Sequence, residues 1–153
     1  LQVPRSLLMN VKRVSPEEAD RMVKEDGYVD LDVRSIPEFE AGHPSGAYNI
    51  PLMHQTTAGM QPNGEFMKVV TSTFDRAAKI VVGCRSGNRS FRAAQMLLQA
   101  GFVDVVDQRA GTSGARDPFG QLQEAGWEHA GLDMAMDPHP ERSYEALRGR
   151  KNG

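Results

Sequence analysis

The chain has 153 residues and a formal net charge of -2, with 39% hydrophobic and 25% charged residues. This length favours one domain, and the scattered basic residues form no stripe that could grip a nucleic-acid backbone. No apolar run approaches the roughly 18 to 20 residues that cross a bilayer, and residues 1–10 lack a cleavable signal pattern. We therefore expect a cytoplasmic protein whose partners include neither nucleic acid nor membranes.

The first half of the chain alternates between helical and strand patterns. The predicted elements are a helix, a strand, a short capped helical turn and a second strand, over residues 16–25, 28–33, 35–40 and 47–50. Ser15 is the predicted N-cap of the first helix, and Glu18 has the spacing that completes a capping box. Residues 53–64 are polar and contain glycine, which indicates a long surface connection.

The second half contains the most apolar strand of the sequence. The predicted elements are a helix, a strand, a helix, a strand and a last helix, over residues 65–73, 79–83, 91–100, 103–106 and 121–125. Residues 79–83 are almost purely apolar, as in a strand buried on both faces of a parallel sheet. The next helix places Ala93, Ala94, Leu97 and Leu98 on one face.

This order of elements predicts a three-layer α/β domain. We expect the domain to span residues 10–137, with terminal extensions at residues 1–9 and 138–153. The second extension contains two prolines and a basic end, so we expect a loosely held tail.

The only cysteine of the chain is Cys84. A single thiol excludes an intrachain disulfide and a multi-cysteine zinc site. The four histidines lack the i, i+4 spacing of a metal site, so we expect no metal and no cofactor. His43, beside Pro44, and Trp127 are predicted to be packing residues.

Cys84 follows the buried strand directly and begins a polar loop that leads into a helix. Such a loop lies at the carboxyl edge of a parallel sheet, where open α/β sheets bind ligands. Unpaired loop amides, the helix N-terminus, Arg85 and Arg89 should favour the thiolate over the thiol. Gly87 permits a tight turn, and the remaining loop residues offer short polar side chains: Ser86, Asn88 and Ser90. A buried structural cysteine is the alternative, but core packing does not explain these polar neighbours.

The segment Cys84-Arg85-Ser86-Gly87-Asn88-Arg89-Ser90 resembles the active-site loop of rhodanese sulfurtransferases. Upstream segments resemble further signatures of this family in their expected order: Leu31-Asp32-Val33-Arg34, Glu38-Phe39, Gly42-His43, Gly46-Ala47 and Asn49-Ile50-Pro51. The resemblance covers residues 14–132. It implies a rhodanese-like fold, in which helices flank a parallel five-stranded sheet.

The resemblance also implies a two-step transfer of sulfur through a persulfide. The Cys84 thiolate would take the outer sulfur of thiosulfate or a related donor, and the persulfide would pass it to cyanide, a thiol or a protein acceptor. Loop amides from Arg85 to Ser90 would hold the persulfide, and Arg85 would attract the anionic donor. Asp32 and Arg34 lie two apart on one strand face, where Asp32 could pair with Arg89 and fix the loop. The alternative for these charges is an exposed ion pair of little consequence.

One segment departs from the family pattern, and two other functions stay open. Many members have a Gly-Gly pair and a nearby tryptophan where this chain has residues 109–114, so residues 111–120 are expected to rim the pocket differently and the donor and acceptor stay open. A phosphatase or arsenate reductase of the same fold would resemble Cys-x5-Arg, whereas Arg89 comes one residue earlier. A persulfide carrier without turnover would have the same sequence features.

Overall fold

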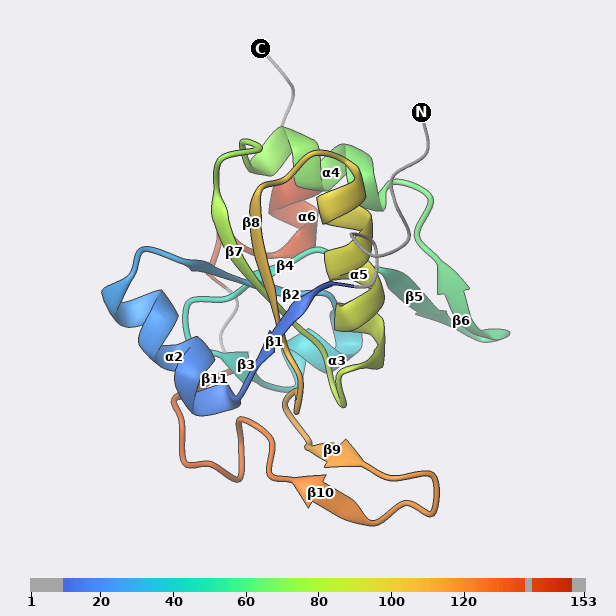
Figure 1. Ribbon diagram of the computed structural model, residues 1–153. Helices are drawn as coiled ribbons and strands as arrows, with labels where there is room; N and C mark the ends of the chain where they lie inside the picture. The colour runs from blue at the N-terminus through green and yellow to red at the C-terminus, as the bar shows by residue number, and fades with distance from the viewer. Residues whose placement is uncertain (1–9, 137–138, 150–153) are drawn as a thin grey trace.

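Five parallel strands form the main sheet, in the order β1-β8-β7-β2-β4 (Figure 1). The computed structural model describes residues 10–136 and 139–149. The strands in this order are β1 (Lys12–Val14), β8 (Asp104–Gln108), β7 (Lys79–Gly83), β2 (Val29–Asp32) and β4 (Tyr48–Asn49). The expected five-stranded parallel sheet is confirmed, and the apolar strand β7 lies at its centre because it is flanked by a strand on each side.

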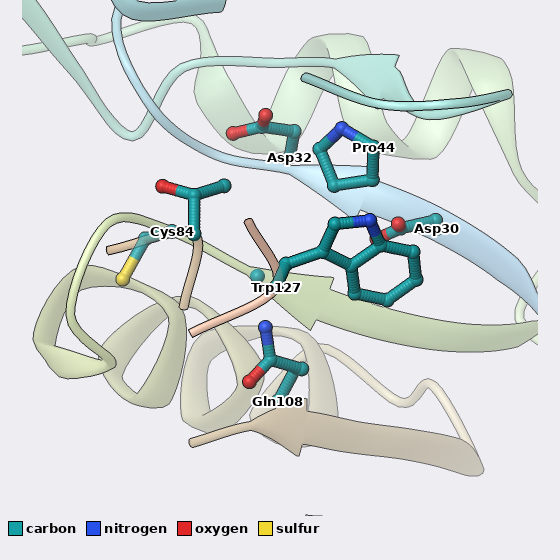
Figure 2. A pocket seen from close by; sticks show the side chains of 8 residues that line it. Asp30, Asp32, Pro44, Cys84, Gln108 and Trp127 are labelled. Carbon is teal, nitrogen blue, oxygen red and sulfur yellow. The ribbon is translucent and has the colours of Figure 1, made fainter. Parts of the chain in front are cut away.

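Helices cover both faces of this sheet. They are α2 (Pro16–Glu25), α3 (Ile36–Glu40), α4 (Phe66–Thr73), α5 (Asn88–Gln99) and α6 (Tyr144–Arg148). One face packs against α2, where Met22 and Val81 share a cluster with Trp127. Figure 2 shows the Trp127 ring beside Asp30, with which it lines a small cavity.

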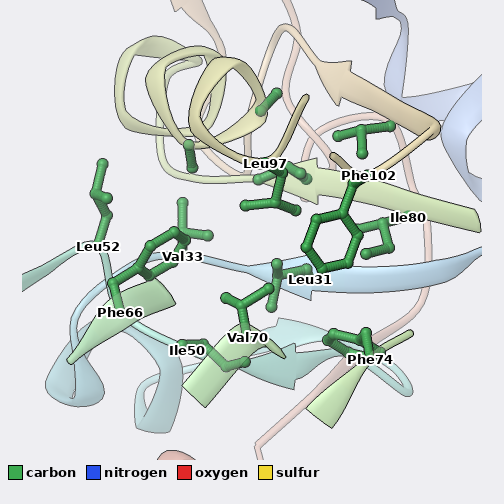
Figure 3. Packing of buried hydrophobic residues seen from close by; sticks show 14 of the residues in the cluster. Leu31, Val33, Ile50, Leu52, Phe66, Val70, Phe74, Ile80, Leu97 and Phe102 are labelled. Atoms are coloured by element: carbon green, nitrogen blue, oxygen red, sulfur yellow. The ribbon is translucent and has the colours of Figure 1, made fainter. Parts of the chain in front are cut away.

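The larger core lies on the other face, against α4, α5 and α6 (Figure 3). Alternate residues of β7 separate the two faces, since Ile80 and Val82 belong to this core and Val81 to the other cluster. Leu97 of α5 and Leu31 of β2 are completely buried. Burial of each such side chain stabilises the fold by roughly 1.5–3 kcal/mol, so this core fixes the strands from which the candidate site begins.

Three small antiparallel pairs lie outside the main sheet. They join β5 (Met53–Thr56) to β6 (Gly59–Pro62), β9 (Ala115–Arg116) to β10 (Leu122–Glu124), and β3 (His43–Pro44) to β11 (Met134–Ala135). Residues 53–64 are thus largely a hairpin, and its exposed positions fit the surface connection expected from the sequence. The helix expected over residues 121–125 is wrong, because Leu122 and Glu124 of this segment pair with β9.

Helix capping follows the expected residues with one difference. Ser15 accepts a hydrogen bond from the Glu18 backbone N–H at 3.1 Å, but the Glu18 carboxylate binds Arg21 instead of closing the capping box. The box is complete at α3, where Ser35 and Glu38 cap each other. This short helix therefore has a fixed start close to the carboxyl end of β2.

The described part of the expected tail is packed against the domain. Tyr144 and Leu147 of α6 are buried in the main core, and the Tyr144 hydroxyl accepts a hydrogen bond from Asn63 at 3.2 Å. The expectation of a loosely held tail is wrong for residues 139–149, because α6 has two apolar residues at i, i+3 spacing that cover α4. Residues 1–9, 138 and 150–153 of the expected extensions lie outside the described residues.

Candidate active site

Cys84 lies immediately after the central strand β7, at the carboxyl edge of the sheet. The residue is 2% exposed. Figure 2 shows its sulfur turned toward the loop that leads into α5 and away from Asp30 and Trp127. The strand therefore presents the thiol to the loop, as expected from the sequence.

Backbone amides of the loop surround the sulfur. Sγ accepts hydrogen bonds from the Gly87 N–H at 3.1 Å and the Ser90 N–H at 3.3 Å. The thiol also lies 3.3 Å from Ser90 Oγ, to which it donates. Because α5 begins at Asn88, the Ser90 amide is one of the first N–H groups of the helix, which have no partner within it. Two such donors at one sulfur favour a negative charge there.

The turn that aims these amides requires glycine at position 87. Gly87 has φ 98°, a left-handed conformation that other residues rarely adopt. A Cβ atom at this position would also collide with the Arg109 carbonyl oxygen. The glycine expected from the sequence to permit a tight turn is thus required twice, by conformation and by space.

The segment that follows β8 packs against the backbone of the cysteine loop. The Thr112 N–H donates to the Cys84 carbonyl and the Ser113 N–H donates to the Arg85 carbonyl, both at 2.9 Å. Gly111 has φ 67°, and a Cβ atom there would collide with the backbone of Arg85. The segment that departs from the family pattern therefore begins as a close backbone support of the cysteine loop and continues into the β9–β10 hairpin.

On the α3 side, an ion pair anchors the start of α5. Arg89 donates from Nη1 and Nη2 to the two oxygens of Glu38 at 2.7 and 3.0 Å. Burial opposes ionisation of Glu38, but hydrogen bonds from Arg89 and Ser35 outweigh it and lower the pKa of this carboxyl to about 2. Glu38 is therefore charged at all ordinary pH values and holds Arg89 in place.

The expected pair between Asp32 and Arg89 is wrong. Asp32 instead binds Arg34, whose Nε and Nη2 reach the carboxylate at 3.1 and 2.7 Å, and Arg34 also donates to the Gly42 carbonyl at 2.7 Å. Both residues are buried, so they are not the exposed pair of the alternative interpretation either. Arg89 is the partner of Glu38 because α3 brings that carboxylate nearer to the start of α5. The Asp32–Arg34 pair thus braces the turn between β2 and α3.

The exposed side chains of the loop are those of Arg85 and Asn88, whereas Ser86 is half-buried. Arg85 borders a hollow of about 220 Å³ that is also lined by Arg34, Glu38, Thr112, Ser113 and Glu128. On the other side of the loop, Asn88 and Arg89 border a second hollow, of about 330 Å³. An anion that approaches the first hollow meets the exposed guanidinium of Arg85.

Three charged residues near the loop were not found from the sequence. Asp30 is buried behind Cys84, beside a cavity of about 10 Å³ that Asp32 and Trp127 also line. Burial and the nearby Asp32 carboxylate raise the pKa of Asp30 to about 8. Asp107 of β8 is fully buried and forms an ion pair with Arg13 of β1 at 2.7 Å. Acidic residues within apolar strands were the signal that could have identified both carboxylates.

Several residues have packing roles, as expected. The rings of His43 and Phe39 stack at 3.8 Å, and His43 Nδ1 lies 2.9 Å from the Phe39 carbonyl oxygen. Trp127 is 4% exposed and donates from its indole nitrogen to the Asp133 carbonyl. Among residues 10–136 and 139–149, no cluster of three or more potential ligands could hold a metal ion, and no helix is long and apolar enough to cross a membrane.

Comparison with known proteins agrees with this arrangement. The rhodanese-like domain family matches residues 15–115. Thiosulfate sulfurtransferase 16, a chloroplastic protein of Arabidopsis thaliana, is 45% identical over 87 residues, which are 57% of this chain and 72% of that protein. Senescence-associated protein DIN1 of Raphanus sativus is 43% identical over 96 residues, which are 63% of this chain and 52% of that protein. The chain thus spans about half the length of some relatives.

Two further similarities are to a solved structure, which concerns the fold, and to a relative with an arsenic-related name. Rv0390 of M. tuberculosis is 24% identical, with a TM-score of 0.68 over 83% of this chain and 98% of that one. Protein HIGH ARSENIC CONTENT 1 of Arabidopsis thaliana is 36% identical over 87 residues, which are 57% of this chain and 52% of that protein. With the cysteine loop at the edge of a five-stranded parallel sheet, and the family match over 15–115, the chain belongs to the family of rhodanese-like domains.

Proposed function

We propose that this protein is a sulfurtransferase that carries a sulfane sulfur on Cys84. The supporting observation is the cradle of the Cys84 sulfur, which accepts two backbone N–H bonds. These donors suit a persulfide anion as well as a thiolate, since both bear a negative charge on sulfur. The similarity to a protein named thiosulfate sulfurtransferase adds support at the level of the family.

The proposed reaction has two displacement steps. The Cys84 thiolate attacks the outer sulfur of thiosulfate, the S–S bond of the donor breaks, and sulfite leaves with the electron pair. A nucleophilic acceptor such as cyanide or a thiolate then attacks the outer sulfur of the persulfide and releases the Cys84 thiolate. Arg85 contributes by attracting the anionic donor, because it is the exposed cation of the loop.

A phosphatase or arsenate reductase is the second candidate, since a relative carries an arsenic-related name. Such chemistry needs an arginine that faces the bound oxyanion. Arg89 instead gives two hydrogen bonds to Glu38, which favours an anchoring role for this side chain. Sulfur transfer does not need a second cysteine of this chain, which fits the single thiol.

The test is to incubate the protein with thiosulfate and measure its intact mass together with released sulfite. We expect the mass of one added sulfur atom on the wild type, equimolar sulfite, and loss of both in Cys84→Ser. Addition of cyanide should then remove the added mass and yield thiocyanate. A wild-type protein that gains no sulfur, or that cleaves an aryl phosphate faster than thiosulfate, would contradict the proposal.

A persulfide carrier is distinguished from an enzyme by the second step. If the persulfide forms but cyanide and small thiols leave it intact, the physiological acceptor is a protein. Capture of proteins from cell extract on the persulfidated chain, with the thiosulfate-free protein as the control, then identifies acceptors by their gain of the sulfur. The proposed partners are therefore a small sulfur-containing anion and a thiol or protein acceptor.

A further inference from the structure

A chain of polar side chains leads from Cys84 away from the solvent-facing side of the loop. The thiol donates to Ser90 Oγ at 3.3 Å, and the Ser90 hydroxyl also interacts with the carboxylate of Asp107. Asp107 Oδ2 in turn binds Arg13 Nε at 2.7 Å. Ser90 and Asp107 are both completely buried. The nucleophile is thus connected through one hydroxyl group to a buried carboxylate.

One oxygen of this carboxylate lacks a conventional partner. Asp107 Oδ1 is buried and, among the described residues, accepts no hydrogen bond of normal geometry. A buried carboxylate oxygen in this state is costly unless it gains a proton or a donor. Burial raises the pKa of Asp107, and its interactions with Ser90 and Arg13 offset this only in part. Asp107 is therefore a carboxylate that gains from protonation.

Arg13 joins this carboxylate to the loop. Besides its bond to Asp107, its Nη2 donates to the Gly87 carbonyl at 3.1 Å, and its guanidinium lies over the Phe91 ring at 4.8 Å. The charged group that acts on Asp107 is Arg13 from β1, and Arg89 from α5 interacts electrostatically with Cys84. Since the Arg13 side chain is 39% exposed, it stays solvated if Asp107 becomes neutral.

We propose that Asp107 is a positioning residue that takes up the Cys84 thiol proton through Ser90. The Sγ–H proton passes to Ser90 Oγ as the hydroxyl proton of Ser90 passes to the Asp107 carboxylate. The products are a Cys84 thiolate, an intact Ser90 hydroxyl that donates to it, and a neutral carboxylic acid. No proton enters or leaves the site, and the buried carboxylate loses its charge. The inference concerns the nucleophile of the proposed sulfurtransferase and rests on that function.

The test is the rate of Cys84 alkylation by iodoacetamide as a function of pH, in the wild type and in Asp107→Asn. The variant keeps the shape of the side chain but cannot accept the proton. We expect alkylation at pH 6 to slow by about tenfold or more and the rates at high pH to converge, the scale of a lost proton acceptor. A purely electrostatic role gives the opposite sign, because loss of a nearby negative charge favours the thiolate. Faster or unchanged alkylation in Asp107→Asn would overturn the proposal.

Two further variants complete the experiment. Asp104→Asn is the matched control, since Asp104 lies on the same strand but pairs with Tyr28 at 2.7 Å, and its pH profile should equal that of the wild type. If Asp107→Asn does not fold, Arg13→Gln decides. Loss of this cation makes Asp107 a better proton acceptor, so alkylation at pH 6 should accelerate, whereas loss of a cation by itself slows it. Slower alkylation in Arg13→Gln would then overturn the proposal.

The outcome is separable from that of the proposed function, because alkylation requires the thiolate but no sulfur donor. A slowed Asp107→Asn variant in a protein that forms no persulfide would keep the proton path and refute sulfur transfer. Persulfide formation in the wild type together with an unaltered Asp107→Asn profile would support sulfur transfer and refute the proton path.

Discussion

A carboxylate lies on each side of the cysteine loop, Glu38 on the α3 flank and Asp107 on the β8 flank. The two carboxylates differ in their affinity for a proton. On the α3 flank, Glu38 accepts two hydrogen bonds from Arg89 and has a pKa of about 2. On the β8 flank, burial raises the pKa of Asp107, and one of its oxygens is unpaired. One flank is therefore a permanent ionic anchor, and the other is suited to proton exchange.

The largest expected effect comes from Gly111→Ala, which pushes the β8 flank away from the loop. The new Cβ would collide with the Arg85 backbone at a position with φ 67°. We expect persulfide formation to fall at least about a hundredfold, since small displacements of a reacting group have effects of this size. Gly64→Ala is the matched control, because that position has open space and an ordinary φ. Wild-type activity in Gly111→Ala would show that the loop does not depend on this support.

The second prediction concerns Asp30, which lines a small buried cavity together with Cys84. Its pKa of about 8 lies well above the ordinary aspartate value of 3.8, so the folded state binds more protons than the unfolded state between these pH values. The free energy of unfolding should therefore fall as the pH rises from about 4 to about 8, with a slope of at most about 1.4 kcal/mol per unit. Asp30→Asn should remove this slope and be more stable than the wild type at pH 8, by up to about 5 kcal/mol.

Urea unfolding of both proteins between pH 4 and pH 8 measures this difference. Near pH 4 and below, the two proteins should be about equally stable, because Asp30 is then largely neutral in the folded and the unfolded state. Asp75→Asn, a change at an exposed aspartate, is the control and should leave the pH dependence unchanged. Parallel curves for the wild type and Asp30→Asn would argue that Asp30 is ionised in the folded protein.

The third prediction tests the α3 flank. Glu38→Gln removes the ion pair with the half-buried Arg89, and we expect a loss of about 1–2 kcal/mol of stability at pH 7. The folded pKa of Glu38 is about 2, below the ordinary glutamate value of 4.5, so this stabilisation is present above pH 4.5 and disappears as the pH falls toward 2. The variant and the wild type should converge in that acid range. Thermal unfolding measures this difference in stability. The control is Glu40→Gln, a change at an exposed residue of α3.

The smallest expected effect separates attraction of the donor from the support of the loop. Arg85→Gln leaves both flanks intact and removes the exposed cation beside the hollow of about 220 Å³. We expect the KM for thiosulfate to rise about threefold at low salt with little change in kcat, because an exposed charge contributes modestly. Arg92→Gln, an exposed cation farther along α5, is the control. A large loss of kcat would instead mean that Arg85 contacts the reacting atoms.

The sequence predicted the parts of the molecule whose cause is local. The ends of α2 and β7 follow from capping residues and an apolar run, and the position of Cys84 follows from that strand. Gly87 was expected to allow a tight turn because few residues adopt a positive φ. The resemblance to the family supplied the role of the loop and the number of strands.

Features that depend on tertiary contacts were not predictable in this way. Strand β1 has only three residues and exists because it pairs with β8. The pairing of Arg89 with Glu38 depends on where α3 lies, which no local pattern states. Asp107 lies just beyond the strand expected over residues 103–106 and was assigned no role, although its burial and its link to Ser90 decide its character. In each case, the deciding neighbour is distant in the sequence.

The cysteine loop also has a regular alternation of buried and exposed positions. Cys84, Gly87 and Ser90 are buried at every third residue, whereas Arg85 and Asn88 point their side chains outward. A library randomised only at positions 85 and 88 would therefore vary the charge and shape that an incoming molecule meets, with the sulfur cradle left unaltered. In evolution or in protein engineering, positions 85 and 88 could therefore vary while Cys84, Gly87 and Ser90 stay fixed.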